Sequence, residues 1–339
     1  MTVRGPVDSS ALGPTLTHEH ILGDVMSWWQ RSTSPGLDPD VFAEQPVSPP
    51  LLWDLKHDPF GNKDNCRLDD VDVAVEEVRR FAALGGSTIL EATGLGIGRN
   101  LAGLREVSER TGVHIVAGTG FYLEAAQPAA LADLDETAVA DLILRDIAEG
   151  EAGIRPGFIG EIGVGQGFTP AEQKSLAAAC LAQREALLPL QIHLPAWFRL
   201  GGEVLDFVEA RGVEPAHVVL CHMGPSGDDP GYQQDLMRRG AWVQYDMIGA
   251  ELFYADQNAQ CPSDEDNARH IARLVGDGWG DRLLLSSDVF LKSLLRRYGG
   301  PGYAHILQYF VPRLERWGIG PETVNRLLVD NPRSVFESL

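Results

Sequence analysis

The chain has 339 residues, and its 28 Lys plus Arg stand against 48 Asp plus Glu, for a formal net charge of −20 at pH 7. With 44% hydrophobic and 22% charged residues, the composition excludes a disordered chain and indicates a substantial core. An acidic surface repels phosphate backbones and anionic lipid headgroups. We therefore expect neither nucleic acid nor a membrane surface as a partner.

Cysteine usage and the absence of apolar runs indicate where the protein is found. The four cysteines, Cys66, Cys180, Cys221 and Cys261, show no C-x-x-C spacing, which is typical of reduced, buried thiols. The first residues lack the apolar stretch of a signal peptide, and no run reaches the roughly 20 apolar residues that cross a bilayer. We expect a cytoplasmic protein.

Short β-rich runs alternate with helical stretches along the whole chain. The expected strands are Pro14–His18, Ser87–Thr93, His114–Gly120, Gly157–Glu161, Pro189–His193, His217–His222, Ala241–Asp246 and Arg282–Asp288. The helical stretches include Val71–Leu84, Leu101–Thr111, Ala138–Glu149, Pro170–Ala186 and Gly202–Arg211. Eight such units predict an α/β fold, a single (β/α)₈ TIM barrel with one domain over residues 1–339. A doubly wound sheet is the alternative, but no G-x-G-x-x-G follows the first strand.

Three segments exceed the minimal barrel. Residues 23–70, which carry Trp28, Trp29 and Trp53, form a long insertion after the first strand, and residues 247–270 form another after the seventh. Loops that follow strands lie at the carboxyl end of a barrel, where active sites are built. We expect the 23–70 insertion to shape specificity, and residues 298–339 to form closing helices.

Four of the nine histidines end predicted strands. His18 and His20 stand in T-H-E-H, His193 in Q-I-H-L and His222 in L-C-H-M. Because side chains alternate along a strand, we expect His18 and His20 to point into the barrel and Glu19 to point outward. Two imidazoles on one side can share a metal ion. An H-x-H by itself is more often a pair of core or surface histidines.

The same alternation predicts that Cys221, which precedes the candidate ligand His222, faces the helical layer.

Two carboxylates strengthen the interpretation of these strand ends as a metal site: Glu161 ends G-F-I-G-E, and Asp288 ends L-L-L-S-S-D. An ionised carboxylate at the end of an apolar strand is costly to bury without a cation or hydrogen-bond donors, although a helix cap or an ion pair would also satisfy it. Together the strand ends predict a metal site formed by His18, His20, Glu161, His193, His222 and Asp288.

Local motifs add a family resemblance over essentially the whole chain. G-P-T-L-T-H-E-H at 13–20, I-G-R-N at 97–100, V-H-I-V-A-G-T-G-F-Y at 113–122 and D-N-P at 330–332 resemble the phosphotriesterase-like family of the amidohydrolase superfamily. The resemblance implies two divalent ions per chain, commonly zinc. It implies that His18, His20 and Asp288 hold the buried ion and that His193 and His222 hold the exposed one. It also implies that Tyr122 lines the substrate pocket.

One position departs from the best-known members, which bridge the two metals with a carboxylated lysine on the fourth strand. Glu161 stands there, and none of the four lysines of this chain lies in a predicted strand. A glutamate can bridge through its two carboxylate oxygens, as in the Glu-bridged branch of the family. The substrate preference of the lysine-bearing phosphotriesterases therefore does not transfer.

These observations predict a binuclear metal-dependent hydrolase. Two divalent cations bridged by Glu161 and a hydroxide would lower the pKa of that water toward about 7, and the hydroxide would act as the nucleophile. Asp288 would take the proton and pass it to the leaving group. We expect a small ester, lactone or amide as substrate, with phosphotriester turnover as a side activity. Zn²⁺ is expected, and His with carboxylate ligands also suits Mn²⁺, Co²⁺ or Fe²⁺.

Two alternatives stay open. TatD-like metal-dependent deoxyribonucleases also carry H-x-H and an I-G-E-I-G strand, as found at 159–163, but the charge and the G-P-T-L-T-H-E-H motif argue against them. A non-catalytic metal-binding barrel would be expected to lack a ligand, and none is missing. The expected partner is a small-molecule substrate, and a homodimer is compatible with the sequence.

Overall fold

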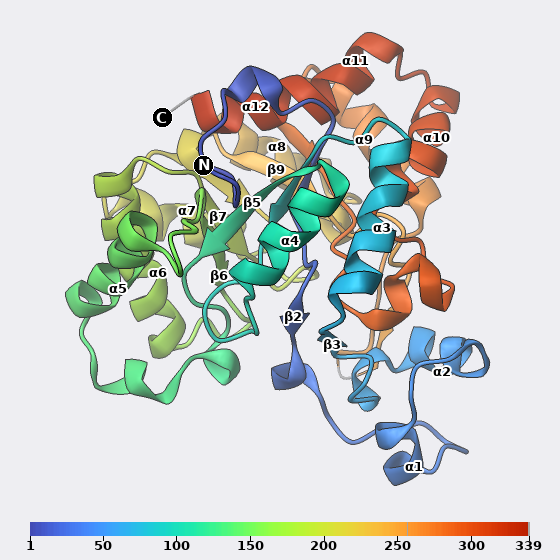
Figure 1. Cartoon of the computed structure of the whole chain (residues 1–339). Helices are drawn as coiled ribbons and strands as arrows, with labels where there is room; N and C mark the ends of the chain where they lie inside the picture. The colour runs from blue at the N-terminus through green and yellow to red at the C-terminus, as the bar shows by residue number, and fades with distance from the viewer. Residues whose placement is uncertain (256, 338–339) are drawn as a thin grey trace.

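The computed structural model describes residues 1–255 and 257–337. Eight strands form one parallel sheet in the order β1-β4-β5-β6-β7-β8-β9-β12, surrounded by helices (Figure 1). Their bounds are β1 Thr15–Glu19, β4 Thr88–Glu91, β5 His114–Thr119, β6 Phe158–Gly163, β7 Leu190–His193, β8 Val218–Leu220, β9 Trp242–Tyr245 and β12 Leu283–Leu285. Each overlaps one of the predicted runs, and the TIM-barrel prediction is confirmed.

Helices follow the strands in the alternation that the sequence predicts. They are α3 Val71–Ala83, α4 Leu101–Thr111, α5 Glu136–Glu149, α6 Pro170–Ala186, α7 Gly201–Glu209, α8 Pro230–Arg238 and α9 Asp264–Gly276. Local chemistry sets their ends. At the start of α6 the Thr169 side chain accepts the Glu172 N–H while the Glu172 carboxylate accepts the Thr169 N–H, with Pro170 at the first helical position. Gly112, at φ +79°, ends α4 in the left-handed conformation that glycine adopts without strain.

The amino-terminal end of the barrel is covered by the end of the chain. The closing helices are α10 Val311–Arg316, α11 Pro321–Asn325 and α12 Asn331–Glu337. Val335 of α12 packs with Val219 and Leu284, whereas Phe336 packs with Leu90 and Val116 on the other side of the barrel interior. Figure 1 shows both termini at this end. The opposite end is therefore the one open for a site.

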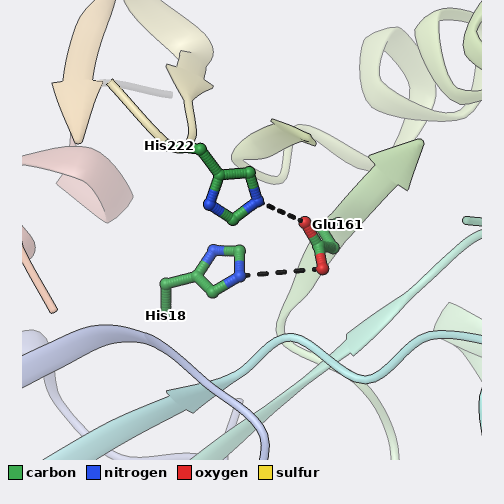
Figure 2. A group of neighbouring side chains, drawn as sticks. All are labelled: His18, Glu161 and His222. Atoms are coloured by element: carbon green, nitrogen blue, oxygen red, sulfur yellow. Dashed lines mark hydrogen bonds and ion pairs between the residues drawn. The ribbon is translucent and has the colours of Figure 1, made fainter. Parts of the chain in front are cut away.

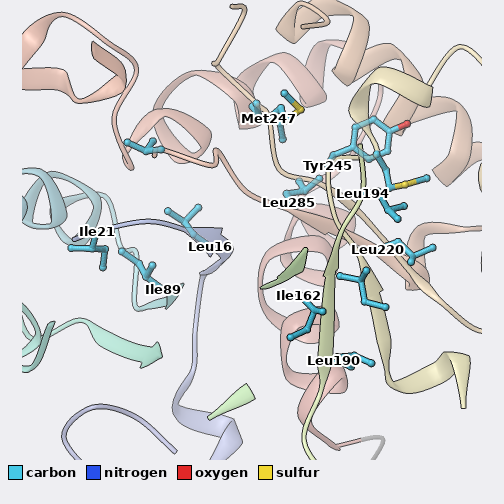
Figure 3. Packing of buried hydrophobic residues seen from close by; sticks show 14 of the residues in the cluster. Leu16, Ile21, Ile89, Ile162, Leu190, Leu194, Leu220, Tyr245, Met247 and Leu285 are labelled. Atoms are coloured by element: carbon cyan, nitrogen blue, oxygen red, sulfur yellow. The ribbon is translucent and has the colours of Figure 1, made fainter. Parts of the chain in front are cut away.

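The side chains that face the helices form the main hydrophobic cluster. Ile162, Leu190 and Leu220, on three adjacent strands, belong to it (Figure 3). Because neighbours in a strand face opposite ways, residues that flank these positions, Glu161 among them, face the interior. In the described part of the chain, no helix combines the length and the apolar character needed to span a bilayer.

The first and last strands meet at a seam held by several polar contacts. His18 N donates to Ser286 Oγ at 2.9 Å, and Thr17 Oγ1 donates to the Leu285 carbonyl at 3.3 Å. Asp288 N donates to the His18 carbonyl at 3.3 Å. These contacts join β1 to the segment at the end of β12, about 270 residues later in the chain, and so close the barrel next to the candidate ligands.

Five strands end one to three residues earlier than predicted, and for β8 and β12 the backbone shows why. β8 ends at Leu220 and β12 at Leu285, because His222 and Asp288 adopt φ values of +59° and +48°, which an extended strand cannot contain. The expectation that Cys221 faces the helical layer was wrong. It packs in the interior with Val219, since His222 lies beyond the strand and its left-handed backbone breaks the alternation.

The segment between β1 and α3 lies at the carboxyl end of the barrel. It begins and ends with an antiparallel pair, β2 Gly23–Asp24 and β3 Arg67–Leu68. Between them lie α1 Pro39–Glu44 and α2 Leu52–His57, which Figure 1 shows at the end opposite the termini. A second short hairpin, β10 Phe253–Tyr254 with β11 Ala259–Gln260, follows β9. Both segments contribute side chains to the site described next.

Candidate metal centre and active site

The structure brings all six predicted metal-ligand residues together at the carboxyl end of the barrel. Glu161 lies at the centre of the group, on β6, and its two oxygens face different partners. Oε1 lies 3.7 Å from His18 Nε2 and 3.4 Å from His20 Nε2. Oε2 lies 3.1 Å from His193 Nδ1 and 3.3 Å from His222 Nε2. Figure 2 shows His18 and His222 directed at opposite oxygens of the carboxylate.

The first group of atoms has the spacing of a metal coordination shell. Asp288 Oδ1 lies 3.7 Å from His18 Nε2 and 3.5 Å from His20 Nε2, and Glu161 Oε1 lies at similar distances from both histidines. Two ligand atoms of a tetrahedral ion at about 2.1 Å are about 3.4 Å apart. These four atoms are too distant for strong hydrogen bonds, and their spacing fits a shared cation. We name this group the first ligand set.

The second group is more compact. His222 Nε2 lies 2.8 Å from His193 Nδ1, and both nitrogens lie within hydrogen-bonding distance of Glu161 Oε2. The Tyr122 hydroxyl lies 3.2 Å from His193 Nδ1. Gly163 permits this approach, because a Cβ there would lie 2.2 Å from the backbone nitrogen of Leu123. We name His193, His222 and Glu161 Oε2 the second ligand set.

An unpartnered atom supports the fit of a cation to the first ligand set. His18 Nε2 is buried and has no hydrogen-bond partner among the described residues, although it faces two carboxylates. A buried polar atom without a partner is costly, and a cation between these groups would satisfy it. The donor set of imidazoles and carboxylates is the one that zinc and related divalent ions prefer.

Burial and the neighbouring charges shift the titration of these groups in different directions. Burial opposes ionisation of Glu161, yet His18 and His193 beside it hold its pKa well below the ordinary value. Burial raises the pKa of Asp288, against the opposing effect of the histidines. Burial and the neighbouring His222 lower the pKa of His193 to about 4. Glu161 is thus an anion and His193 a neutral imidazole at pH 7, the forms in which each binds metal.

A third group of side chains that could bind a metal ion already contains a hydrogen-bond donor, the Gln244 amide. His18, Cys221 and Asp246 offer atoms within 4.8 Å of one another. The Gln244 amide nitrogen lies among them, 3.2 Å from His18 Nδ1, and donates to Cys221 Sγ and to Asp246 Oδ2. Burial also raises the pKa of the Cys221 thiol to about 11. This group therefore orients His18 and offers no thiolate ligand.

Two buried carboxylates lie behind the ligands. The sequence pointed to Asp246, which ends the seventh expected strand, as a support for the ligands, and did not point to Glu91. Asp246, at the end of β9, contacts His222 Nδ1 at 3.0 Å and accepts its backbone N–H. Glu91, at the end of β4, accepts the Thr93 hydroxyl at 2.6 Å, and that hydroxyl lies 2.9 Å from His20 Nδ1. Such partners fix the orientation of ligating imidazoles. For Asp246 the signal was a carboxylate at the end of an expected strand, whereas Glu91 lies two residues before the end of the expected strand Ser87–Thr93.

A cavity of about 260 Å³ opens beside the ligands. It is lined by His20, Glu161, His193, His222 and Asp288 on the barrel side and mainly by apolar side chains elsewhere. Of the three tryptophans in the insertion expected to shape specificity, Trp28 lines the cavity, whereas Trp29 lies beneath the Lys63 amine and Trp53 is 71% exposed. Tyr122 lines the cavity as well.

Comparisons with known proteins agree with this geometry. The model of the phosphotriesterase family matches residues 1–336. An N-acetyltaurine hydrolase from Salmo salar is 32% identical over 98% of this chain and 96% of its own length. The crystal structure of a resiniferatoxin-binding protein from Rhodobacter sphaeroides is 49% identical, with a TM-score of 0.96 over 99% of this chain and 94% of that one.

An organophosphorus hydrolase from Deinococcus radiodurans is 28% identical, with a TM-score of 0.77 over 99% of this chain and 96% of that one. Several of these relatives are named hydrolases, and the match to the family model extends over nearly the whole chain. The family resemblance seen in the sequence motifs is therefore confirmed. The chain belongs to the phosphotriesterase family and is a metal-dependent hydrolase of that family's type.

Proposed function

We propose that the protein is a binuclear hydrolase that cleaves a small carboxylic ester, lactone or amide with two divalent ions, zinc first among them. One observation carries the proposal: the two oxygens of Glu161 are divided between two groups of histidines. A carboxylate that only formed an ion pair could direct both oxygens at the same partner. A carboxylate that bridged two cations would have to direct one oxygen at each ligand set.

The proposed ligands follow from the two sets. His18, His20 and Asp288 would hold one ion, His193 and His222 the other, and Glu161 would touch both. Bound there, divalent ions would lower the pKa of a water molecule and polarise the oxygen of the scissile group. The protein's part is to hold the ligands in place, and the contacts from Asp246 and Thr93 to His222 and His20 support that role.

We assign the proton transfer to Asp288. Its Oδ1 faces His18 and His20, whereas Oδ2 lies 3.8 Å from His222 Nδ1, and the residue lines the cavity. One oxygen can thus remain a ligand while the other receives a proton and returns it to the leaving group. Burial raises the pKa of Asp288, which favours its acting as a base that then becomes an acid.

The last parts of the proposal are that Tyr122 contacts the substrate and that the substrate is a carboxylic derivative. The Tyr122 hydroxyl, 3.2 Å from His193 Nδ1, reaches the side of the cavity where a carbonyl oxygen would be held. The relatives include N-acetyltaurine hydrolases, which favours a carboxylic derivative as the substrate. The relative named organophosphorus hydrolase supports phosphotriester turnover as a side activity.

The test uses Glu161→Gln, which keeps the shape of the side chain and removes its charge. We expect fewer than two ions per chain by elemental analysis and a loss of kcat/KM above about 100-fold, since even groups that only orient a ligand are worth 10–100-fold. Glu77→Gln is the matched control, because Glu77 is equally buried and accepts the backbone N–H groups of Arg296 and Arg297, and none of these three residues lines the cavity. Two ions and full turnover in Glu161→Gln would refute the bridge.

A second candidate function is binding of a ligand without turnover. The relative that is 49% identical is named for the ligand it binds, and the cavity here is lined mainly by apolar side chains beyond the candidate metal ligands. Purified metal-loaded protein that binds small esters and amides but hydrolyses none of them would favour this candidate.

A further inference from the structure

One wall of the cavity is built of aromatic rings. Phe290 lies 6.4 Å from His20, ring centre to ring centre, and Phe60 lies 6.2 Å from Phe290. Tyr254 lies 5.2 Å from Phe60, and Trp197 lies 5.1 Å from Tyr254. All four side chains line the cavity. We call this continuous row of rings, which begins at a candidate ligand, the aromatic wall.

The aromatic wall is assembled from distant parts of the chain. Trp28 extends it by stacking on Phe60 at 5.3 Å, and these two residues belong to the segment between β1 and α3. Trp197 follows β7, Tyr254 belongs to β10, and Phe290 follows β12. Four separate loops thus each place aromatic surface on one cavity. Such convergence makes an apolar contact surface for a ligand.

Apart from the candidate metal ligands, the described lining of this cavity offers no cationic side chain. Among the described residues that line it, none is Lys or Arg. The cations on the same loops are engaged elsewhere: Lys63 pairs with Glu44 and lies over the Trp29 ring, and Arg199 pairs with Asp228. A sulfonate or carboxylate held against the aromatic wall would lose its hydration without gaining a Lys or Arg partner, which is costly. The negative faces of aromatic rings add to that penalty.

We propose that the enzyme is selective for uncharged substrates that carry a bulky apolar group beyond the scissile bond, and that it discriminates against substrates with an anionic group in that position. This proposal rests on the proposed hydrolase function and narrows its substrate class. It also predicts a difference from the related N-acetyltaurine hydrolases, whose named substrate carries a sulfonate.

A matched pair of amides tests the proposal. N-acetyltaurine and N-(3,3-dimethylbutyl)acetamide share the acetyl group and the two methylenes, and differ in a sulfonate against a tert-butyl group of similar size. With zinc-loaded protein, we expect kcat/KM to favour the neutral amide by at least about 100-fold, because an unpaired charge is costly to bury. Quenching of tryptophan fluorescence, which Trp28 and Trp197 can report from the cavity, measures binding independently of turnover.

A variant pair places the selectivity on the aromatic wall. Trp28→Ala should raise KM for the neutral amide about 10-fold, as expected when apolar contact area is lost, and leave kcat unchanged. Trp53→Ala removes a tryptophan from the same segment that is exposed and does not line the cavity, so both constants should stay as in the unmodified enzyme.

The outcomes separate the two proposals. If neither amide is hydrolysed but only the neutral one binds, the hydrolase proposal fails for this class and the selectivity holds. If N-acetyltaurine is hydrolysed as well as the neutral amide, the selectivity is refuted and the hydrolase proposal stands. If both amides bind equally well and neither is hydrolysed, the selectivity is refuted and the hydrolase proposal fails for this class. Failure of the neutral amide to bind at all would also refute the selectivity.

Discussion

Glu19 holds the backbone on both sides of Asp288. Its Oε1 accepts a hydrogen bond from Ser287 N at 2.8 Å, and its Oε2 accepts one from Val289 N at 2.9 Å. Asp288 itself has φ +48°, a conformation that costs a non-glycine residue about 1–2 kcal/mol. Since Glu19 stands between His18 and His20 in sequence, one carboxylate links the backbone of three proposed ligands.

The first prediction concerns this link. Glu19→Gln should lower the free energy of unfolding by about 1–3 kcal/mol, because an amide group must face a backbone donor that the carboxylate accepted. It should also weaken metal retention, since Asp288 is then held less firmly. Urea denaturation and metal analysis after dialysis measure the two effects.

Glu77→Gln again provides the control for Glu19. Glu77 is buried and likewise accepts two backbone N–H groups, so its variant should lose comparable stability while keeping its metal. Equal metal retention in both variants would show that Glu19 supports the fold alone.

The second prediction separates the two roles of Asp288. A poor leaving group such as an amine needs a proton as it departs, whereas a nitrophenolate does not. Asp288→Asn should therefore reduce kcat/KM much more on an amide than on the nitrophenyl ester of the same acid. The difference should reach about 10²–10⁴-fold, the usual value of general acid–base catalysis. Equal losses on both substrates would make Asp288 a ligand only.

The third prediction concerns which of the two ligand sets binds its metal ion more tightly. The atoms of the first ligand set already have spacings of 3.4–3.7 Å, whereas His222 Nε2 and His193 Nδ1 lie 2.8 Å apart and must separate to admit an ion. The first set should bind more tightly. Stepwise chelation should leave one ion per chain, and that ion should persist in His193→Ala but be lost in His20→Ala. Two ions that leave together in the unmodified protein would contradict this order.

Metal loading should also raise the melting temperature, because an ion that binds only the folded state stabilises it by mass action. A melting temperature that does not change when the metal is removed would count against ligands fixed in the folded barrel.

The fourth prediction concerns the thiols. Burial raises the pKa of Cys66, Cys180 and Cys261 to about 12 and that of Cys221 to about 11, so less than about one thiol in 500 is ionised at pH 8. Native protein should leave Ellman's reagent almost unchanged over minutes, and four thiols should react after unfolding in guanidinium. A fast-reacting thiol in the native protein would show that one of these sites opens.

Much of the site could be predicted because the carboxyl ends of parallel strands lie together at one end of the barrel. The sequence showed where strands stop, and His18, Glu161 and His193 in strands β1, β6 and β7 lie together for that reason. The orientation of Cys221 could not be predicted, since it depends on the left-handed backbone of His222.

The aromatic wall could not be predicted either. Phe60, Trp197 and Phe290 are separated by long stretches of chain and by loops of irregular shape. No periodicity in the sequence relates residues in such loops, and only the tertiary packing brings their rings together.

The seam between β1 and β12 has a consequence for how the protein opens and closes. The first ligand set takes His18 and His20 from one side of the seam and Asp288 from the other, so an ion bound there would cross-link the two ends of the barrel. Removing it should release the seam as a local unfolding unit, and amide hydrogen exchange in β1 and β12 should accelerate before that of β6 and β7. Acquisition of the metal would then act as the last step of folding, after the slow closure of contacts between opposite ends of the chain.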